Sequence, residues 1–179
     1  MTTRLVVTGP ESTGKTTLAR DLATMLGAPF VAEASRAYAE EVRAHGKDLG
    51  ASDVEPIARR QMEDEDTALR DHPRVVVLDT DLISTVVYAR HYYGACPAWI
   101  EKTARARLGA LYLLCATDIP WAADGVRYRP AARGEIHALF ASTLSEFGAR
   151  VVPVSGLGPS RLREASGALR TALPEHMAR

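Results

Sequence analysis

The sequence has little of what marks several large classes of protein. Only two of its 179 residues are cysteines and its five histidines are scattered, so we expect neither a disulfide framework nor a zinc site. Basic and acidic residues both number 22, and a net charge of zero gives no sign of a nucleic-acid or membrane partner. No apolar run approaches the roughly 18 residues that span a bilayer, and the N-terminus lacks a signal-peptide pattern. These absences favour one cytoplasmic domain over residues 1–179 and leave its oligomeric state open.

Short apolar runs of strand length alternate with amphipathic segments along the chain. The runs are nearly continuous, which is typical of parallel strands that are buried on both faces. The sequence therefore predicts a three-layer α/β fold whose ligands bind at the carboxyl ends of the strands. The expected strands are Arg4–Thr8, Arg74–Leu78, Ala110–Cys115 and Arg150–Val154, with a weaker fifth at Pro29–Ala32. The expected helices are about Lys15–Leu26, Ser35–His45, Asp53–Arg70, Asp81–Tyr92, Pro97–Leu108, Ala132–Phe147 and Ser160–Ala172.

A glycine-containing loop lies between the first expected strand and the first expected helix. Its pattern, Gly9-x4-Gly14-Lys15-Thr16, is that of a phosphate-binding loop in the required strand–helix context. The glycines let successive N–H groups point inward, where they bind phosphate oxygens together with the positive end of the helix. Lys15 reaches the β- and γ-phosphates, and the Thr16 hydroxyl binds Mg²⁺. We therefore predict a site for ATP and Mg²⁺ formed by Gly9, Glu11, Ser12, Thr13, Gly14, Lys15, Thr16 and Thr17.

The buried run Arg74–Leu78 is followed directly by Asp79. An aspartate at the end of such a strand holds Mg²⁺ through the water shell of the ion. A strand-terminal aspartate can instead cap the next helix, but Asp81 is better placed for capping. Asp79 is therefore predicted to be the second metal residue beside Thr16.

Three classes of phosphate-loop protein compete for this chain. A GTPase would carry an Asn-Lys-x-Asp motif and an Asp-x-x-Gly switch, and the sequence has neither in the expected place. A mechanochemical ATPase usually has a second carboxylate immediately after the strand-end aspartate, where this chain has Thr80. A small-molecule kinase needs an acceptor pocket, a base and a cationic lid, and candidates for all three occur.

The candidate lid spans residues 118–133 and follows the expected strand Ala110–Cys115, over the carboxyl edge of the sheet. It contains Arg127, Arg129 and Arg133, and the planar donors of arginine match phosphate oxygens and stabilise charge during phosphoryl transfer. We assign Arg127 and Arg133 to catalysis, and Trp121 and Asp124 to the substrate. The alternative is a solvated charged loop.

The candidate acceptor pocket lies beside the phosphate loop. Glu33 ends the second expected strand, with Arg36 one helical turn later on the same face. The helix after Asp79 carries a polar and aromatic stripe that suits a flat ring and a ribose, although the tyrosines could also be mere rim packing. The predicted substrate residues are Glu33, Arg36, Asp81, Tyr88 and Tyr92, with Glu33 and Asp81 as the candidates for the catalytic carboxylate. Trp99 is the remaining aromatic residue near the predicted cleft, with packing as its alternative role.

Four segments resemble the ribosylnicotinamide kinase domain of NadR-type NAD-biosynthesis proteins: GPESTGKTTLARDLA, EASRAYAEE, VVLDTDLISTVVYARHYYGACPAWI and LYLLCATDIPWAADGVRYRPAAR. The likeness extends from about residue 4 to residue 165. It implies a P-loop kinase with a five-stranded parallel sheet and a short lid, which transfers the γ-phosphate of ATP to the 5′-hydroxyl of nicotinamide riboside. The family commonly has Glu-Tyr-Ala-Arg where this chain has Glu33-Ala34-Ser35-Arg36.

Two features of that family are not expected here, because the first strand begins at Arg4: the adenylyltransferase and DNA-binding domains that often precede the kinase. Two other functions stay open beside the resemblance. One is a kinase for another nucleoside or small metabolite, and the other is a regulatory ATP-binding module without turnover.

Overall fold

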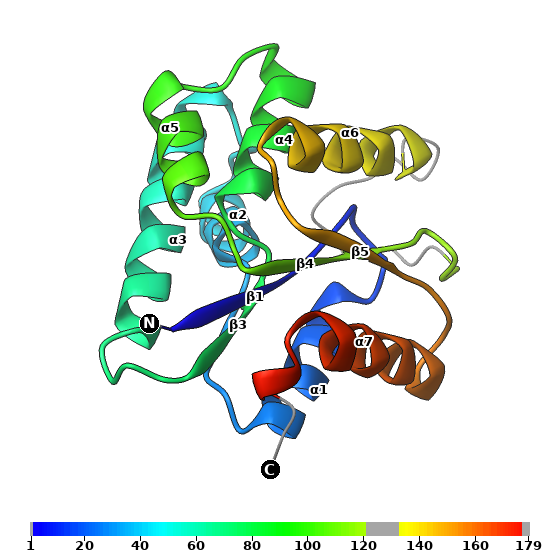
Figure 1. Ribbon diagram of the computed structural model, residues 1–179. Coiled ribbons are helices and arrows are strands. Elements are labelled where there is room, and N and C mark those ends of the chain that lie inside the picture. Colours follow the sequence, from blue (N-terminus) through cyan, green and yellow to red (C-terminus); the bar gives the residue numbers. More distant parts are fainter. Residues whose placement is uncertain (1, 121–132, 177–179) are drawn as a thin grey trace.

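The computed structural model describes residues 2–120 and 133–176, and residues 1, 121–132 and 177–179 lie outside the described part. Its centre is a parallel sheet of five strands in the order β2-β3-β1-β4-β5, with helices on both faces (Figure 1). This confirms the predicted α/β class. The strands are β1 (Thr3–Thr8), β2 (Phe30–Val31), β3 (Val75–Asp79), β4 (Leu111–Cys115) and β5 (Val151–Val154).

The helices are α1 (Lys15–Leu26), α2 (Ala34–Ala44), α3 (Val54–Ala68), α4 (Leu82–Tyr93), α5 (Ala98–Ala106), α6 (Arg133–Glu146) and α7 (Pro159–Ala172). Helices α1 to α6 lie between successive strands and α7 follows β5, all within one or two residues of their predicted bounds. Two 3-10 turns, η1 (Ala51–Asp53) and η3 (Pro174–His176), complete the described elements. Among these described helices, none is both long and apolar enough to cross a membrane.

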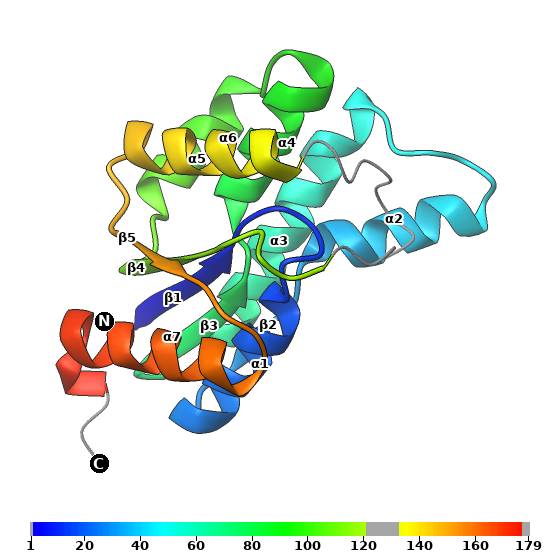
Figure 2. The same ribbon diagram turned by 90° about the vertical axis from the view of Figure 1, so that its right-hand side faces the viewer.

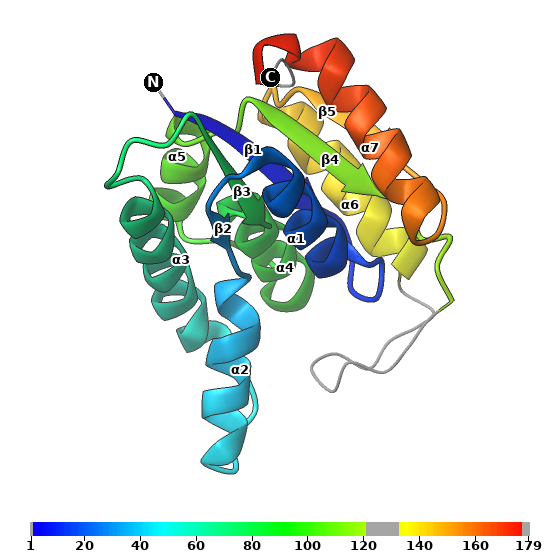
Figure 3. The ribbon, with the colours of Figure 1, turned by 90° about the horizontal axis from the view of Figure 1, so that it is seen from below.

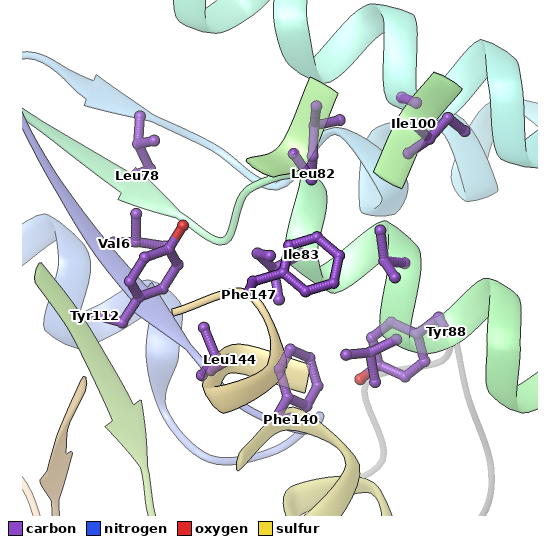
Figure 4. Packing of buried hydrophobic residues seen from close by; sticks show 14 of the residues in the cluster. Val6, Leu78, Leu82, Ile83, Tyr88, Ile100, Tyr112, Phe140, Leu144 and Phe147 are labelled. Carbon is purple, nitrogen blue, oxygen red and sulfur yellow. The ribbon is translucent and has the colours of Figure 1, made fainter. Parts of the chain in front are cut away.

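Alternate residues of each strand pack against opposite helical layers. In β3, Val75 and Val77 join the core on the side of α1 and α7, whereas Val76 and Leu78 join the core beneath α3 to α6. Figure 2 shows α1 and α7 on one face of the sheet and α4, α5 and α6 on the other. Figure 4 shows the second core, where Tyr112 of β4 lies beside Val6 of β1 and near Leu144 of α6. Because both faces are covered, the inner positions of β1, β3 and β4 are nearly all apolar.

The strand order brings three loops together at one edge of the sheet. β1 pairs with β3 on one side and with β4 on the other, so the crossovers diverge at the carboxyl end of β1. Val7 of β1 pairs with Asp79 of β3, and the Thr80 N–H donates to the Val7 carbonyl at 2.9 Å. The loop after β1 therefore begins beside the end of β3. Figure 3 shows α2 projecting away from this sheet.

Candidate active site

Two glycines allow the predicted phosphate loop to follow its path. Gly9 has φ +133°, and a Cβ there would lie 3.0 Å from the Cys115 carbonyl oxygen. Gly14 has φ +73°, and its Cβ would lie 2.8 Å from the Cδ1 atom of Ile119. Both positions take a left-handed φ, and Gly9 also lies against the backbone of Cys115, so a residue with a side chain would strain the loop. Ser12, between them, also takes a positive φ of 53°.

The carbonyl oxygens of the loop are held by side chains. Lys15 Nζ and Thr13 Oγ1 donate to the Pro10 carbonyl at 2.7 and 2.8 Å. Arg133 Nη2 donates to the Ser12 carbonyl at 3.1 Å, and Arg161 Nη1 donates to the Thr13 carbonyl. Since the N–H of a trans peptide points opposite its carbonyl, these bonds turn the N–H groups to the other side of the loop. The arrangement fits an anion-binding concavity.

The N-terminus of α1 adds to that concavity. Its N-cap is Gly14, which supplies no capping side chain, and the first turn, described throughout, holds no acidic residue. The positive end of the helix dipole and the N–H groups of the first turn therefore face the loop without an acidic side chain from that turn. Thr17 is exposed on this turn.

Thr16 and Asp79, the two predicted metal residues, are hydrogen-bonded to each other. Asp79 follows Val75 and Val77 at the alternation of β3, so its side chain lies on the α1 face of the sheet. Thr16 Oγ1 donates to Asp79 Oδ2 at 2.5 Å, while Asp79 Oδ1 is buried and has no hydrogen-bond partner in the described part of the chain. Burial, and then the nearby Glu33, raise the pKa of Asp79.

A hydroxyl beside a buried carboxylate fits Mg²⁺, which prefers oxygen ligands and keeps several waters or phosphate oxygens of its substrate. The orphaned Oδ1 of Asp79 is the observation that supports this fit. Among residues 2–120 and 133–176, no cluster of three or more His, Cys, Asp or Glu side chains could hold a metal by itself. A Mg²⁺ ion held by Thr16 and Asp79 would take its other ligands from water or from phosphate oxygens of the nucleotide.

A cavity of about 390 Å³ lies next to Asp79, because Thr80 forms part of its wall. The rest of the wall comes from α2, the α2–α3 connection, α3 and α4. The cavity brings together four of the predicted substrate residues, namely Glu33, Asp81, Tyr88 and Tyr92. The rings of Tyr88 and Tyr92 are stacked, with centroids 6.0 Å apart and planes at 6°. The wall also includes four residues that the sequence did not single out, namely Arg43, Asp48, Gln61 and Tyr93.

Asp81 is held rigidly at the base of this cavity. Its Oδ1 accepts a hydrogen bond from the Ile83 N–H at 3.0 Å, which makes Asp81 the predicted N-cap of α4. Its Oδ2 accepts a hydrogen bond from the Tyr112 hydroxyl at 2.5 Å. Burial raises the pKa of Asp81 to about 7, against the opposing effect of the Tyr112 hydrogen bond. A carboxyl group in this state can hold or accept a proton near neutral pH.

Glu33 and Arg36 lie at the start of α2, and only Glu33 is among the described residues that line the cavity. Glu33 Oε1 accepts a hydrogen bond from Ser35 Oγ at 2.5 Å, and both residues line the cavity. Arg36 is not among the described residues of the cavity wall; its charge instead acts on Asp79, whose pKa it lowers slightly against the larger effect of burial. The prediction that both belong to the substrate site stays a prediction.

Only the two ends of the predicted lid are described. Arg133 is buried, and its Nη2 also donates to the Ile119 carbonyl at 2.9 Å. At the other end, Asp118 pairs with the buried Arg161 of α7, a residue that no local pattern indicated. The four other predicted lid residues, Trp121, Asp124, Arg127 and Arg129, lie outside the described residues.

Trp99 packs against the hydrophobic core, which is the alternative to a place near the cleft. It lies on α5, packs against the core beneath α4, and carries the Arg59 guanidinium 4.8 Å from its ring centroid. It is not among the described residues that line the cavity.

Comparisons with known proteins agree with this geometry. Over 127 aligned residues the chain is 30% identical to the trifunctional NAD biosynthesis/regulator protein NadR of Escherichia coli strain K12. The alignment covers 69% of this chain and 30% of that protein, so the chain spans less than a third of its relative. A NadR crystal structure in complex with NR has a TM-score of 0.79 and 28% identity, covering 96% of this chain and 50% of that one.

A second NadR structure, in complex with NAD and AMP-PNP, has a TM-score of 0.75 at 28% identity and covers 96% of this chain and 49% of that one. The predicted resemblance to NadR-type proteins and the predicted P-loop fold are therefore confirmed. Residues 4–161, most of the chain, match the model of an AAA domain family, AAA_28. The chain therefore belongs to this AAA domain family.

Proposed function

We propose that the chain is an ATP-dependent kinase that phosphorylates the 5′-hydroxyl of nicotinamide riboside and yields nicotinamide mononucleotide. The observation that carries the proposal is that the cavity adjoins the phosphate loop. Tyr88 of the cavity wall donates a hydrogen bond to Glu11 of the loop at 2.9 Å. A donor site and an acceptor site that share a wall bring the reacting groups together, which is most of what phosphoryl transfer asks of a protein.

The comparisons support a P-loop kinase and both proposed substrates. NadR structures hold NR in one case and the ATP analogue AMP-PNP in another, and both align with nearly the whole of this chain. The cavity supports the riboside independently, because stacked tyrosines and two carboxylates suit a flat ring with a permanent positive charge. Contact between a cation and an aromatic face contributes about 0.5–2 kcal/mol, depending on desolvation.

In the proposed reaction the 5′-oxygen bonds to the γ-phosphorus while the bond from that phosphorus to the terminal oxygen of ADP breaks. Lys15 and the N–H groups of residues 12–16 bind the phosphate oxygens and stabilise their charge. Mg²⁺, held by Thr16 and Asp79, would neutralise negative charge on the phosphates. Asp81 positions the acceptor hydroxyl and takes its proton, while Glu33 contacts the substrate or water on the metal.

Arginines at the lid complete the proposed site. Arg133 is placed beside Ser12, and its buried Nε has no hydrogen-bond partner among the described residues. A phosphate oxygen would satisfy this donor, which supports the assignment of Arg133 to charge stabilisation. Arg127 has the same proposed role, and Trp121 and Asp124 are proposed to enclose the riboside.

ADP release, measured over a panel of ribosides, tests the proposal. We expect kcat/KM for nicotinamide riboside to exceed that for uridine, cytidine and adenosine. A clear preference for a neutral nucleoside would reject the nicotinamide assignment and leave the kinase assignment standing. Tight ATP binding without turnover of any riboside would instead indicate a regulatory module.

A further inference from the structure

One side chain of the phosphate loop does not suit nucleotide binding. Glu11 is 4% exposed, and its Oε2 accepts a hydrogen bond from the Tyr88 hydroxyl at 2.9 Å. Its Oε1 is buried and has no hydrogen-bond partner within residues 2–120 and 133–176. None of the ion pairs found among those residues includes Glu11.

A buried carboxylate in an anion-binding loop repels the phosphates that the loop binds, because like charges interact strongly where water is scarce. The Lys15 ammonium and the N-terminus of α1 attract phosphate, whereas Glu11 opposes it. The negative charge of Glu11 is therefore a cost to the nucleotide site. We therefore look for a role of Glu11 at Tyr88, the residue to which it is hydrogen-bonded.

The hydrogen bond leads to the acceptor cavity. Tyr88 belongs to α4 and lines the cavity, and its ring contacts two other aromatic residues. The Tyr92 ring is stacked on it. The Phe140 ring, labelled with Tyr88 in Figure 4, meets it edge-on at a centroid distance of 5.7 Å. Packing thus fixes the ring of Tyr88, and Glu11 fixes its hydroxyl.

A tyrosine hydroxyl that donates to a carboxylate becomes electron-rich, because hydrogen bonds polarise their donors. The added electron density strengthens the negative face of the ring, which is the part that attracts cations. The carboxylate behind the ring adds a negative potential at the same wall. The stronger ring face and the negative potential both favour a positively charged acceptor ring over a neutral ring of the same shape.

We propose that Glu11 determines the charge specificity of the acceptor cavity: acting through Tyr88, it makes the cavity prefer a cationic ring over a neutral one. Glu11 is a positioning residue in this role, since Tyr88 lies between it and the substrate. The inference rests on the proposed function, because it takes the cavity to be the acceptor site.

The test compares nicotinamide riboside with its neutral 1,4-dihydro form, which differs by one hydride and keeps the ribose and the carboxamide. For the wild type we expect the larger kcat/KM with the cationic riboside. Glu11→Gln keeps the size of the side chain and removes its charge, and we expect the cationic-to-neutral ratio to fall about fivefold, within the range of cation–π energies. The KM for ATP should stay constant or fall, because a repulsive charge has been removed.

Tyr88→Phe removes the hydroxyl, keeps the ring, and should lower the ratio by a similar factor. The double variant should lower it no further than the stronger single variant, because both changes break the same hydrogen bond. Tyr38→Phe is the matched control: its hydroxyl donates to Asp53 Oδ1 at 3.0 Å, and neither residue is among the described residues that line the cavity. We expect Tyr38→Phe to leave the ratio unchanged.

Several results would overturn the inference. An equal loss of kcat/KM for both ribosides in Glu11→Gln would indicate packing alone, and a raised KM for ATP with an unchanged ratio would assign Glu11 to the nucleotide. A variant counts as folded if its AMP-PNP affinity lies within about twofold of wild type. If Glu11→Gln does not fold by this measure, Tyr88→Phe is the test, and an unchanged cationic-to-neutral ratio in that variant rejects the inference. A wild-type chain that phosphorylates neither riboside rejects the proposed function and this inference together, whereas an unchanged ratio in active variants rejects the inference alone.

Discussion

The two sides of the candidate site are built in different ways. The donor side consists of eight consecutive residues, 9–16, and one strand-end carboxylate, Asp79, and it offers mainly backbone N–H groups. The acceptor side is a cavity whose walls come from α2, the α2–α3 connection, α3 and α4, and it offers mainly side chains. A backbone site recognises phosphate whatever is attached to it, whereas a side-chain site selects one molecule. Changes to Lys15 or Asp79 on the donor side should therefore impair the reaction with every acceptor, and changes on the acceptor side should act on the riboside while ATP binding is kept.

The largest effect is expected for Lys15→Ala on the donor side. Lys15 supplies the loop's ammonium group, and its loss should lower kcat by about 10²–10³ with every acceptor, as for other donors to a developing charge. ADP release measures the rate, and circular dichroism should show an unchanged fold. Lys102→Ala, exposed on α5, is the matched control and should keep the wild-type rate. Near-normal turnover in Lys15→Ala would contradict the kinase proposal.

Asp79→Asn should have the next largest effect and should likewise act on all acceptors. The change keeps the shape of the side chain but removes the charge proposed to hold Mg²⁺, so turnover should fall about 10²-fold and the half-saturating Mg²⁺ concentration should rise. A Mg²⁺ titration of the rate gives both numbers. Asp71→Asn at an exposed position should change neither. An unshifted Mg²⁺ curve in Asp79→Asn would remove Asp79 from the metal site.

On the acceptor side, Asp81→Asn should lower kcat for the riboside about 10- to 10²-fold while ATP affinity stays within about twofold, because Asp81 is proposed to hold the acceptor hydroxyl. Calorimetry with AMP-PNP separates the two quantities. Asp53→Asn is a close control, because Asp53 also accepts hydrogen bonds from a backbone N–H, that of Gly50, and from a tyrosine hydroxyl, that of Tyr38. Equal effects of the two changes would mean that Asp81 only stabilises the fold.

The smallest effect is expected for Tyr92→Leu. Loss of its stacked ring should raise the KM for the riboside about three- to tenfold, the range of an aromatic pair, and leave the KM for ATP unchanged. Trp99→Leu removes an aromatic residue outside the described cavity wall and should lower the melting temperature without changing the riboside KM. If both KM values rose together in Tyr92→Leu, the separation into a donor and an acceptor side would fail.

Much of the fold and the donor side could be predicted from sequence, because the signals are local. Runs such as Val75-Val76-Val77-Leu78 are apolar at every position, which is typical of a strand that is covered on both faces. The loop pattern is contiguous, and its flanking strand and helix identify it. Even the meeting of Thr16 with Asp79 follows from the alternation of β3 once the two strands are paired.

The acceptor side was predictable only along single helices. The spacing of Asp81, Tyr88 and Tyr92 on α4 indicated one face of the cavity. The hydrogen bond from Tyr112 to Asp81 joins residues 31 positions apart, and that from Tyr88 to Glu11 joins residues 77 apart. Arg161 reaches the loop across 148 positions. Contacts of this kind depend on how the elements pack together, so the periodicity of the sequence does not predict them.

The most direct test of the central claim is the stoichiometry of the reaction. The wild-type chain is incubated with ATP, Mg²⁺ and nicotinamide riboside, and nicotinamide mononucleotide and ADP are quantified by mass spectrometry, with the 5′-deoxy riboside as the control that lacks the acceptor hydroxyl. Our account predicts equal amounts of the two products, and neither the mononucleotide nor riboside-dependent ADP from the control. ADP formed without the mononucleotide, or no turnover while ATP remains bound, would contradict it.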